Sequence, residues 1–162
     1  MPSPSRRVLD GLGLLVRVGL AAGWLVSGSL KVVDPAQTRL AVRAYEILPP
    51  GAVAPVATLL PLAELVLGTL LLVGAFIQWV ALASGVLLGV FMIGLAQAWA
   101  RGLAIDCGCF GGGGPVAGGS TRYPQELARD VGLLALALWL LVRPRTAVSV
   151  DGLRAGAGQV AG

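Results

Sequence analysis

The chain has 162 residues, of which 56% are hydrophobic and only 12% are charged. A soluble domain of this size cannot bury that much apolar surface, so the composition predicts an integral membrane protein. The net charge of +4 comes from basic residues scattered singly through the polar segments, which does not indicate nucleic-acid binding. Because the chain contains no histidine, it lacks the commonest metal ligand and imidazole ligation of haem, so neither haem nor a metal is expected.

The first long apolar segment, residues 12–30, is interrupted only by Arg17. Its 19 residues are enough to cross a membrane and exceed the apolar core of a signal peptide, which favours a retained first span. Arg17 lies close to the start of this helix, where it can either extend back toward Arg6 and Arg7 or have a buried role. Gly19 and Gly23 form a G-x-x-x-G pair, which predicts the close approach of another helix.

The next segment is amphipathic. Asp34 can cap a helix and Pro35 suits its first turn, while apolar residues recur at helical spacing up to Leu48. Pro49 and Pro50 end the pattern. We therefore expect a short interfacial helix over about residues 35–48, lying on the membrane surface between spans 1 and 2.

Residues 53–100 contain a single charged side chain, Glu64, and are about twice as long as one span. The segment must fold back on itself, and the turn is expected near residues 74–78. This predicts the second and third spans at about residues 53–75 and 78–100.

The remainder of the chain divides into three parts. Residues 101–123 form a glycine-rich polar loop that holds both cysteines, residues 124–142 form a fourth apolar helix with charges in its first two turns, and residues 143–162 are expected to be a disordered tail. Residues 1–142 are thus predicted to form one membrane domain, an all-α four-transmembrane-helix bundle.

Four spans place both termini on one side of the membrane and the cysteine loop on the other. Arg6 and Arg7 precede the first span and only Lys31 follows it closely. The positive-inside rule then favours cytoplasmic termini and an extracytoplasmic loop in the cell (inner) membrane.

The two cysteines, Cys107 and Cys109, are separated only by Gly108. A disulfide between them closes a three-residue loop, for which chain entropy supplies at most roughly 1.5 kcal/mol, so it would be a poor structural crosslink. Strained, exposed disulfides are easily reduced, and Gly108 relieves the backbone restriction between the sulfurs. The pattern favours a redox-active pair, although incidental loop thiols or a copper or zinc ion held by two thiolates are alternatives.

Neighbouring charges act in opposite directions on such thiols. Asp106 would raise the thiol pKa values, whereas Arg101 or the N-terminal end of the last helix would lower them. Glu64 lies near mid-bilayer, where an ionisable group is a functional candidate by default. Arg17 is its obvious partner from the sequence, and a structural hydrogen bond, proton transfer or binding of a quinone head group are its possible roles.

An ordered set of short motifs runs through the chain, and its most specific member is Asp106-Cys107-Gly108-Cys109-Phe110-Gly111. The others, in chain order, are Ser27-Gly28 with Lys31, Asp34-Pro35, Tyr45, Leu48-Pro49, Leu60-Pro61 with Glu64 and Gly68, Phe91, Arg101-Gly102, and Arg129 with Leu133. In content and order, this set resembles the MauE family, named for methylamine utilisation, within the larger DoxX-like group of four-span membrane proteins.

The resemblance covers about residues 12–142. It implies a four-helix bundle that helps to form or maintain disulfides in exported proteins, beside a thioredoxin-like partner. The first hypothesis is therefore a membrane thiol:disulfide oxidoreductase with Cys107 and Cys109 as its catalytic pair. Its supporting residues would be Asp106, Gly108, Phe110, Arg101 and Arg129.

Such a pair needs a separate electron acceptor or electron donor, depending on the direction of electron flow, because the chain has no other cysteine. By analogy with other four-helix disulfide-generating enzymes, a quinone near Glu64 or Arg129 is the natural expectation. The alternative hypothesis is a non-enzymatic scaffold or copper chaperone that uses the same loop.

Overall fold

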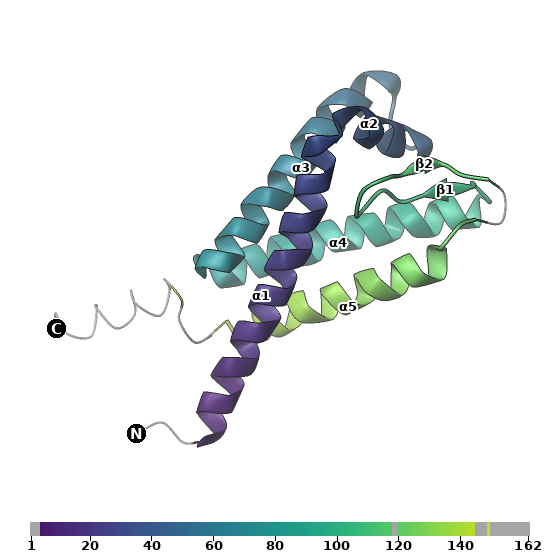
Figure 1. Ribbon diagram of the computed structural model, residues 1–162. Coiled ribbons are helices and arrows are strands. Elements are labelled where there is room, and N and C mark those ends of the chain that lie inside the picture. Colours follow the sequence, from purple (N-terminus) through teal and green to yellow (C-terminus); the bar gives the residue numbers. More distant parts are fainter. Residues whose placement is uncertain (1–3, 118–119, 145–148, 150–162) are drawn as a thin grey trace.

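The computed structural model describes residues 4–117, 120–144 and 149, with side chains from residue 8 onward. These residues form α1 (Pro4–Val33), α2 (Pro35–Ala44), α3 (Pro50–Val73), α4 (Ile77–Ala100), β1 (Ile105–Asp106), β2 (Gly114–Pro115) and α5 (Tyr123–Val142), as Figure 1 shows. Apart from residues 143, 144 and 149, the predicted tail lies outside the described residues.

Three of the helices are long and apolar enough to cross a membrane, as predicted, namely Val8–Val33 within α1, then α3 and α4. The chain is therefore a multi-pass membrane protein in contact with a lipid bilayer. The 20-residue α5 carries three charged residues in its first two turns, and its crossing of the membrane remains a prediction.

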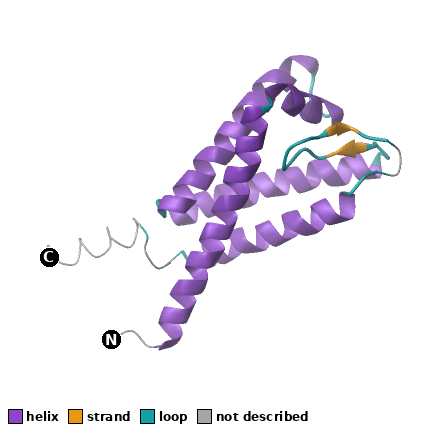
Figure 2. Ribbon diagram, viewed as in Figure 1, coloured by secondary structure: helices purple, strands orange, loops and turns teal. Residues whose placement is uncertain are grey.

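The four long helices form two packed pairs rather than four parallel columns. One pair is α1 with α3, the other is α4 with α5, and α1 also contacts α5. The pairs diverge from the turn between α3 and α4, and α2 and the two strands lie at the open end (Figures 1 and 2). This wedge shape leaves room for the cysteine loop.

Close backbone approach holds α1 against α3. A Cβ at Gly28 would lie 3.0 Å from the Pro61 carbonyl oxygen, and one at Gly68 would lie 3.1 Å from the Ala21 carbonyl oxygen. Small residues allow two membrane helices to approach in this way. The predicted G-x-x-x-G pair, Gly19 and Gly23, instead faces leucines of α5 at ordinary contact distances.

The two connections of α3 are built from capping residues and left-handed backbone. Asp34 accepts a hydrogen bond from the Gln37 N–H at 2.9 Å and caps α2, which ends at Ala44, earlier than the predicted residue 48. It ends early because Glu46 adopts a positive φ of 52° ahead of two prolines. At the other end, Gly74 has a φ of 75° and closes α3 at the predicted turn.

The purely helical prediction missed β1 and β2, which pair antiparallel with Ile105 opposite Pro115 and Asp106 opposite Gly114. Strand propensity does not predict this pairing, because one strand begins in a run of glycines and glycine is depleted in ordinary strands. The pair encloses the cysteines, so this correction concerns the region with the most chemistry.

Candidate functional site

Backbone that only glycine adopts easily shapes the loop around the thiols. Gly108 has a φ of 68°, and Gly111 to Gly114 all have positive φ as well. At Gly108, a Cβ would also lie 2.8 Å from the Ala41 Cβ of α2. The loop can therefore turn tightly and lie directly against α2 only with glycine at this position.

Cys107 and Cys109 are both buried, with 8% and 9% of their surface exposed, and they are not disulfide-bonded in this structure. The Cys109 N–H donates a hydrogen bond to Cys107 Sγ at 3.3 Å, and Nη2 of Arg129 donates to the same sulfur at 3.7 Å. Both donors favour the thiolate of Cys107 over its thiol.

The two thiols are shifted in opposite directions. Hydrogen bonding from the Cys109 side chain lowers the pKa of Cys107, and the Cys109 N–H and Arg129 add to the effect against the opposing desolvation. The pKa of Cys109 is raised well above its ordinary value, first by its hydrogen bond with Cys107 and then by burial. Cys107 is therefore the better nucleophile and leaving group.

A buried polar cluster lies on the Cys109 side of the loop and consists of Ser27, Lys31 and Glu64. Lys31 Nζ forms an ion pair with the Glu64 carboxylate and donates to Ser27 Oγ at 2.9 Å. Ser27 Oγ in turn bonds Glu64 Oε2 at 2.9 Å and donates to the carbonyl oxygen of Cys109. The ion pair between α1 and α3 is thus connected directly to the backbone of the thiol loop.

The expected pairing of Glu64 with Arg17 is wrong. Arg17 is buried beside Gly74 at the far end of α3, where a Cβ on Gly74 would clash with Nη1 of Arg17. The antiparallel packing of α1 on α3 brings Ser27 opposite Glu64, one turn before Lys31. Of the two alternatives considered for Arg17, the structure shows the buried one.

A polar pocket of about 850 Å³ lies on the Cys107 side. Cys107 is the only one of the two cysteines in its wall, and α5 supplies one side through Glu126 and Arg129. Residues 120–122 complete the rim together with Phe110, whose ring lies 4.6 Å from the Arg129 guanidinium carbon. Water and a polar partner can reach Cys107 from here.

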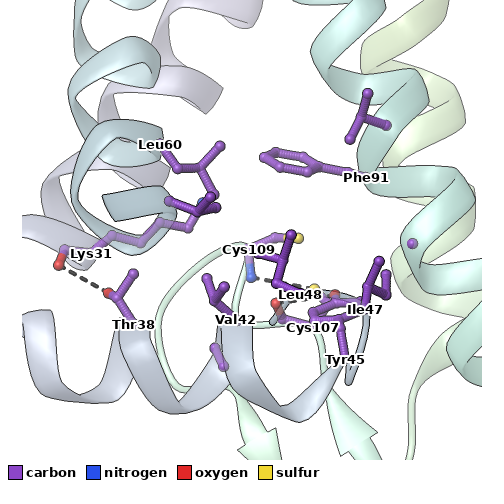
Figure 3. Close-up of a pocket in the computed structure, with 15 residues that line it drawn as sticks. Lys31, Thr38, Val42, Tyr45, Ile47, Leu48, Leu60, Phe91, Cys107 and Cys109 are labelled. Atoms are coloured by element: carbon purple, nitrogen blue, oxygen red, sulfur yellow. Dashed lines mark hydrogen bonds between the residues drawn. The ribbon is translucent and has the colours of Figure 1, made fainter. Parts of the chain in front are cut away.

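An apolar pocket of about 240 Å³ lies on the opposite side and reaches both cysteines. Figure 3 shows Leu60 of α3 and Phe91 of α4 facing each other across it, with Lys31 on one side and the thiols at its end. Val42 of α2 and Tyr45, which directly follows α2, form its floor. The thiol pair thus separates a polar space from an apolar one.

The structure brings only some of the predicted supporting residues to the thiols. Arg129, Gly108 and Phe110 lie at the pair, and Asp106 Oδ1 accepts the Gly108 N–H at 3.0 Å and shapes the turn. Arg101 does not contact the cysteines. It pairs with Glu46 at 2.8 Å on the exposed surface, because α4 ends with this side chain directed toward the link between α2 and α3.

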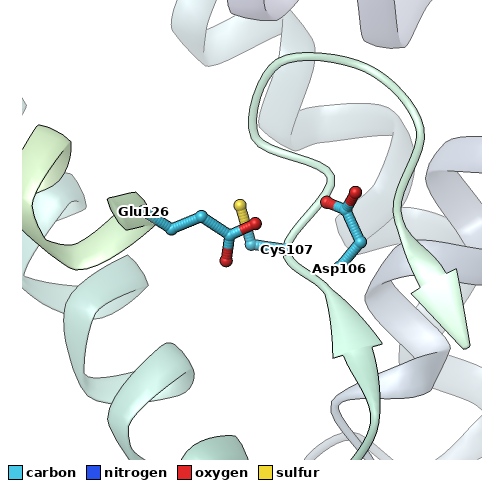
Figure 4. Close-up of side chains that lie close together, drawn as sticks. All are labelled: Asp106, Cys107 and Glu126. Atoms are coloured by element: carbon cyan, nitrogen blue, oxygen red, sulfur yellow. The ribbon is translucent and has the colours of Figure 1, made fainter. Parts of the chain in front are cut away.

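Three ligand-type side chains gather at the rim of the polar pocket. The nearest ligand atoms of Asp106, Cys107 and Glu126 all lie within 4.8 Å of one another (Figure 4). One thiolate with two carboxylates offers a mixed ligand set for a divalent ion. This cluster uses only one of the two cysteines, unlike the two-thiolate site considered from the sequence.

Sequence reasoning missed the roles of Ser27 and Lys31, which entered only as family motifs. Their spacing of four residues places both on one face of a helix, and Lys31 ends the first apolar run. Glu126 was also missed, although its place one turn before Arg129 predicts that the two share a face.

The fold and the site together define a multi-pass membrane protein that holds a buried pair of cysteines between a polar and an apolar pocket. The family model described as "Methylamine utilisation protein MauE" matches residues 9–143, and the chain belongs to this family. No curated protein and no solved structure matches the chain.

Proposed function

We propose that the chain is a membrane thiol:disulfide redox protein whose Cys107/Cys109 pair exchanges disulfides with an extracytoplasmic thioredoxin-like protein. By this exchange it would support disulfide formation in exported proteins. The observation that carries the proposal is the placement of Cys107 in the wall of a polar pocket, with Cys109 buried directly behind it.

The exchange needs two thiol–disulfide steps. A thiolate of the reduced partner attacks Cys107 Sγ of the disulfide, the Cys107–Cys109 bond breaks, and Cys109 leaves with a proton. The partner's second thiolate then attacks the partner's first sulfur, which is bonded to Cys107 in the mixed disulfide. Cys107 is released as a thiolate. The partner gains a disulfide, and the pair becomes the dithiol.

Arg129 and the Cys109 N–H support this scheme because both donate to Cys107 Sγ, the atom released in the last step. A stabilised thiolate leaves faster from a mixed disulfide. The polar rim, which includes Thr121, Arg122 and Gln125, offers hydrogen-bonding groups to a docked backbone.

The proposal is tested by trapping the mixed disulfide. A thioredoxin with its resolving cysteine changed to serine, and its remaining thiol activated as the mixed disulfide with thionitrobenzoate, should form a stable adduct with Cys107 of the Cys109→Ser protein as the thionitrobenzoate thiolate leaves. The Cys107→Ser protein should form at least tenfold less adduct, because Cys109 does not line the polar pocket. Equal trapping by both variants, or by neither, contradicts the proposal.

We also propose that α5 crosses the membrane, with cytoplasmic termini and the loop outside the cytoplasmic (inner) membrane. The charged residues of α5 lie in its first two turns beside the loop, so the apolar part that follows can enter the bilayer. A membrane-impermeant maleimide should label Cys107 in intact spheroplasts. Labelling only after lysis would indicate the opposite orientation, with the loop on the cytoplasmic side.

A second candidate function is metal transfer through the cluster of Asp106, Cys107 and Glu126. A metal carrier of this kind would bind one divalent ion, tested with Zn(II), per chain under anaerobic conditions, with affinity that falls at least tenfold in the Glu126→Gln protein. Trapping of the thioredoxin adduct without metal binding favours the first function.

A further inference from the structure

The apolar pocket is large enough to hold a ring-shaped ligand. Its volume of about 240 Å³ exceeds the ~150 Å³ of an engineered protein cavity that binds benzene. Val56, Leu60, Val90 and Phe91 supply its apolar walls.

The mouth of this pocket opens between two membrane spans. Leu60 and Val90 line it from α3 and α4, and Val90 is 58% exposed. Their neighbours Leu59 and Ile93 are 64% and 71% exposed on the outer surfaces of the same two helices. Because exposed residues of two membrane spans border the pocket, a ligand dissolved in the bilayer can approach it from the side.

The inner end of the pocket combines one cation with two thiols. Lys31 lines the pocket while Glu64 and Ser27 hold its ammonium group, which lies 5.3 Å from the centre of the Phe91 ring. An ammonium group is a hydrogen-bond donor without acceptor capacity, so it matches a carbonyl oxygen on a ligand. Cys107 and Cys109 line the same end.

The cysteine count points to an electron acceptor outside the chain. The chain contains no cysteine outside the pair, so a second pair of thiols in the same chain cannot take over the electrons. An acceptor that is lipid-soluble, has a ring, carries a carbonyl group and takes two electrons fits the mouth, the walls, Lys31 and the thiols together.

We propose that the apolar pocket binds a lipid-soluble quinone, with its ring between Leu60 and Phe91 and one carbonyl oxygen on Lys31. This inference rests on the proposed thiol exchange, which returns the pair to the dithiol. In the step that follows, the two S–H bonds break and an S–S bond forms between Cys107 and Cys109. Two electrons and two protons pass to the quinone, which leaves as the hydroquinone.

This placement changes the residues expected to meet the quinone. Arg129 lines the polar pocket on the other side of the pair, and Glu64 acts through Lys31 rather than lining the apolar pocket itself. Lys31 is therefore the binding residue, and Glu64 is a positioning residue that fixes its ammonium group.

The direct test uses the full chain in nanodiscs of quinone-free phosphatidylcholine. The protein is reduced, freed of reductant and mixed with decylubiquinone. We expect one hydroquinone, measured by ultraviolet absorbance, for each Cys107–Cys109 disulfide measured by mass-tag alkylation. Failure to form hydroquinone, or disulfide formation in a different ratio, overturns the proposal.

Two variants locate the reaction in this pocket. Leu60→Trp fills the space beside Phe91 and should raise the decylubiquinone concentration for half-maximal rate at least tenfold. Leu59→Trp adds the same bulk one residue away on the exposed surface and should leave that concentration unchanged. Equal effects of the two substitutions overturn the assignment.

A photolabel on the unsubstituted protein avoids the question of whether a bulky substitution disturbs folding. An azido-quinone should label peptides that contain residues 56–60 and 90–94, in competition with decylubiquinone. Labelling confined to other peptides, or competition by phospholipid alone, overturns the proposal.

The outcomes for the two proposals are separable, because the thioredoxin adduct forms without any quinone. An adduct without oxidation by decylubiquinone overturns the quinone site alone. Oxidation by decylubiquinone without an adduct overturns the thioredoxin exchange alone.

Discussion

The two cysteines occupy the same short loop, yet their surroundings differ. Cys107 lines a polar pocket beside Arg129, whereas Cys109 lies against the polar cluster of Ser27, Lys31 and Glu64 and reaches only the apolar space. Under the proposed function, a soluble partner would approach the pair from the polar side and a lipid-soluble acceptor from the apolar side. One thiol pair would then connect an aqueous reaction to a membrane reaction without a second pair.

The largest effect is expected from breaking the ion pair on the Cys109 side. Lys31→Met leaves the Glu64 carboxylate buried without its cation, and loss of one partner of a buried pair costs about 3–5 kcal/mol of folding free energy. Unfolding in detergent, followed by circular dichroism, measures this loss.

The matched control removes both charges. Lys31→Met combined with Glu64→Leu should recover most of the lost stability, since no isolated charge remains in the interior. If the double variant is less stable than Lys31→Met, the polar cluster contributes more than its ion pair, and the comparison of the two sides must be revised.

The next largest loss of stability is expected from displacing the loop from α2. Gly108→Ala forces a Cβ into positive φ and to 2.8 Å from Ala41, which together should cost about 2–4 kcal/mol. Gly102→Ala has the same backbone requirement, with a φ of 67°, but nothing lies within 4 Å, so it should cost only about 1 kcal/mol.

Thermal unfolding of the two alanine variants separates backbone strain from the contact with α2. Equal losses of stability in the two variants would mean that the loop can move away from α2 at Gly108. In that case α2 does not hold the thiols in place.

On the polar side, Arg129→Met should raise the pKa of Cys107, because it removes a donor to the sulfur. The pKa of Cys107 lies below its ordinary value, so its alkylation by iodoacetamide should level off at a lower pH than that of a free thiol. In the variant the profile should move to higher pH, with a lower rate at pH 7. A profile that does not move would assign the lowered pKa to the Cys109 hydrogen bonds alone.

The sequence was informative where hydrophobic runs and capping residues acted locally. Three spans and the turn at Gly74 followed from the length of apolar runs and from one glycine. The partner of Glu64 did not follow, because it depends on the register of α1 against α3, which close contacts at Gly28 and Gly68 set. Neither contact can be derived from the spacing of residues along a single helix.

The cysteine loop was likewise only partly predictable from the sequence. Cys107 and Cys109 were evident as the only thiols, and the glycines indicated unusual backbone. The apolar pocket lies between residues of the two helix pairs, and the polar pocket lies between the loop and α5. No local pattern encodes either arrangement, so the different surroundings of Cys107 and Cys109 could not be predicted from the sequence.

The smallest effect is expected from Arg101, which sequence reasoning placed beside the thiols together with Arg129. Its ion pair with Glu46 is exposed, and such pairs contribute about 0.2–1 kcal/mol. Arg101→Met should therefore change unfolding by no more than this amount and leave the pH profile of Cys107 alkylation where it is. A shift equal to that of Arg129→Met would mean that long-range charge, rather than contact with the sulfur, sets the reactivity of Cys107. Because the two substitutions remove the same charge from the same end of the molecule, the pair isolates the contribution of that single contact.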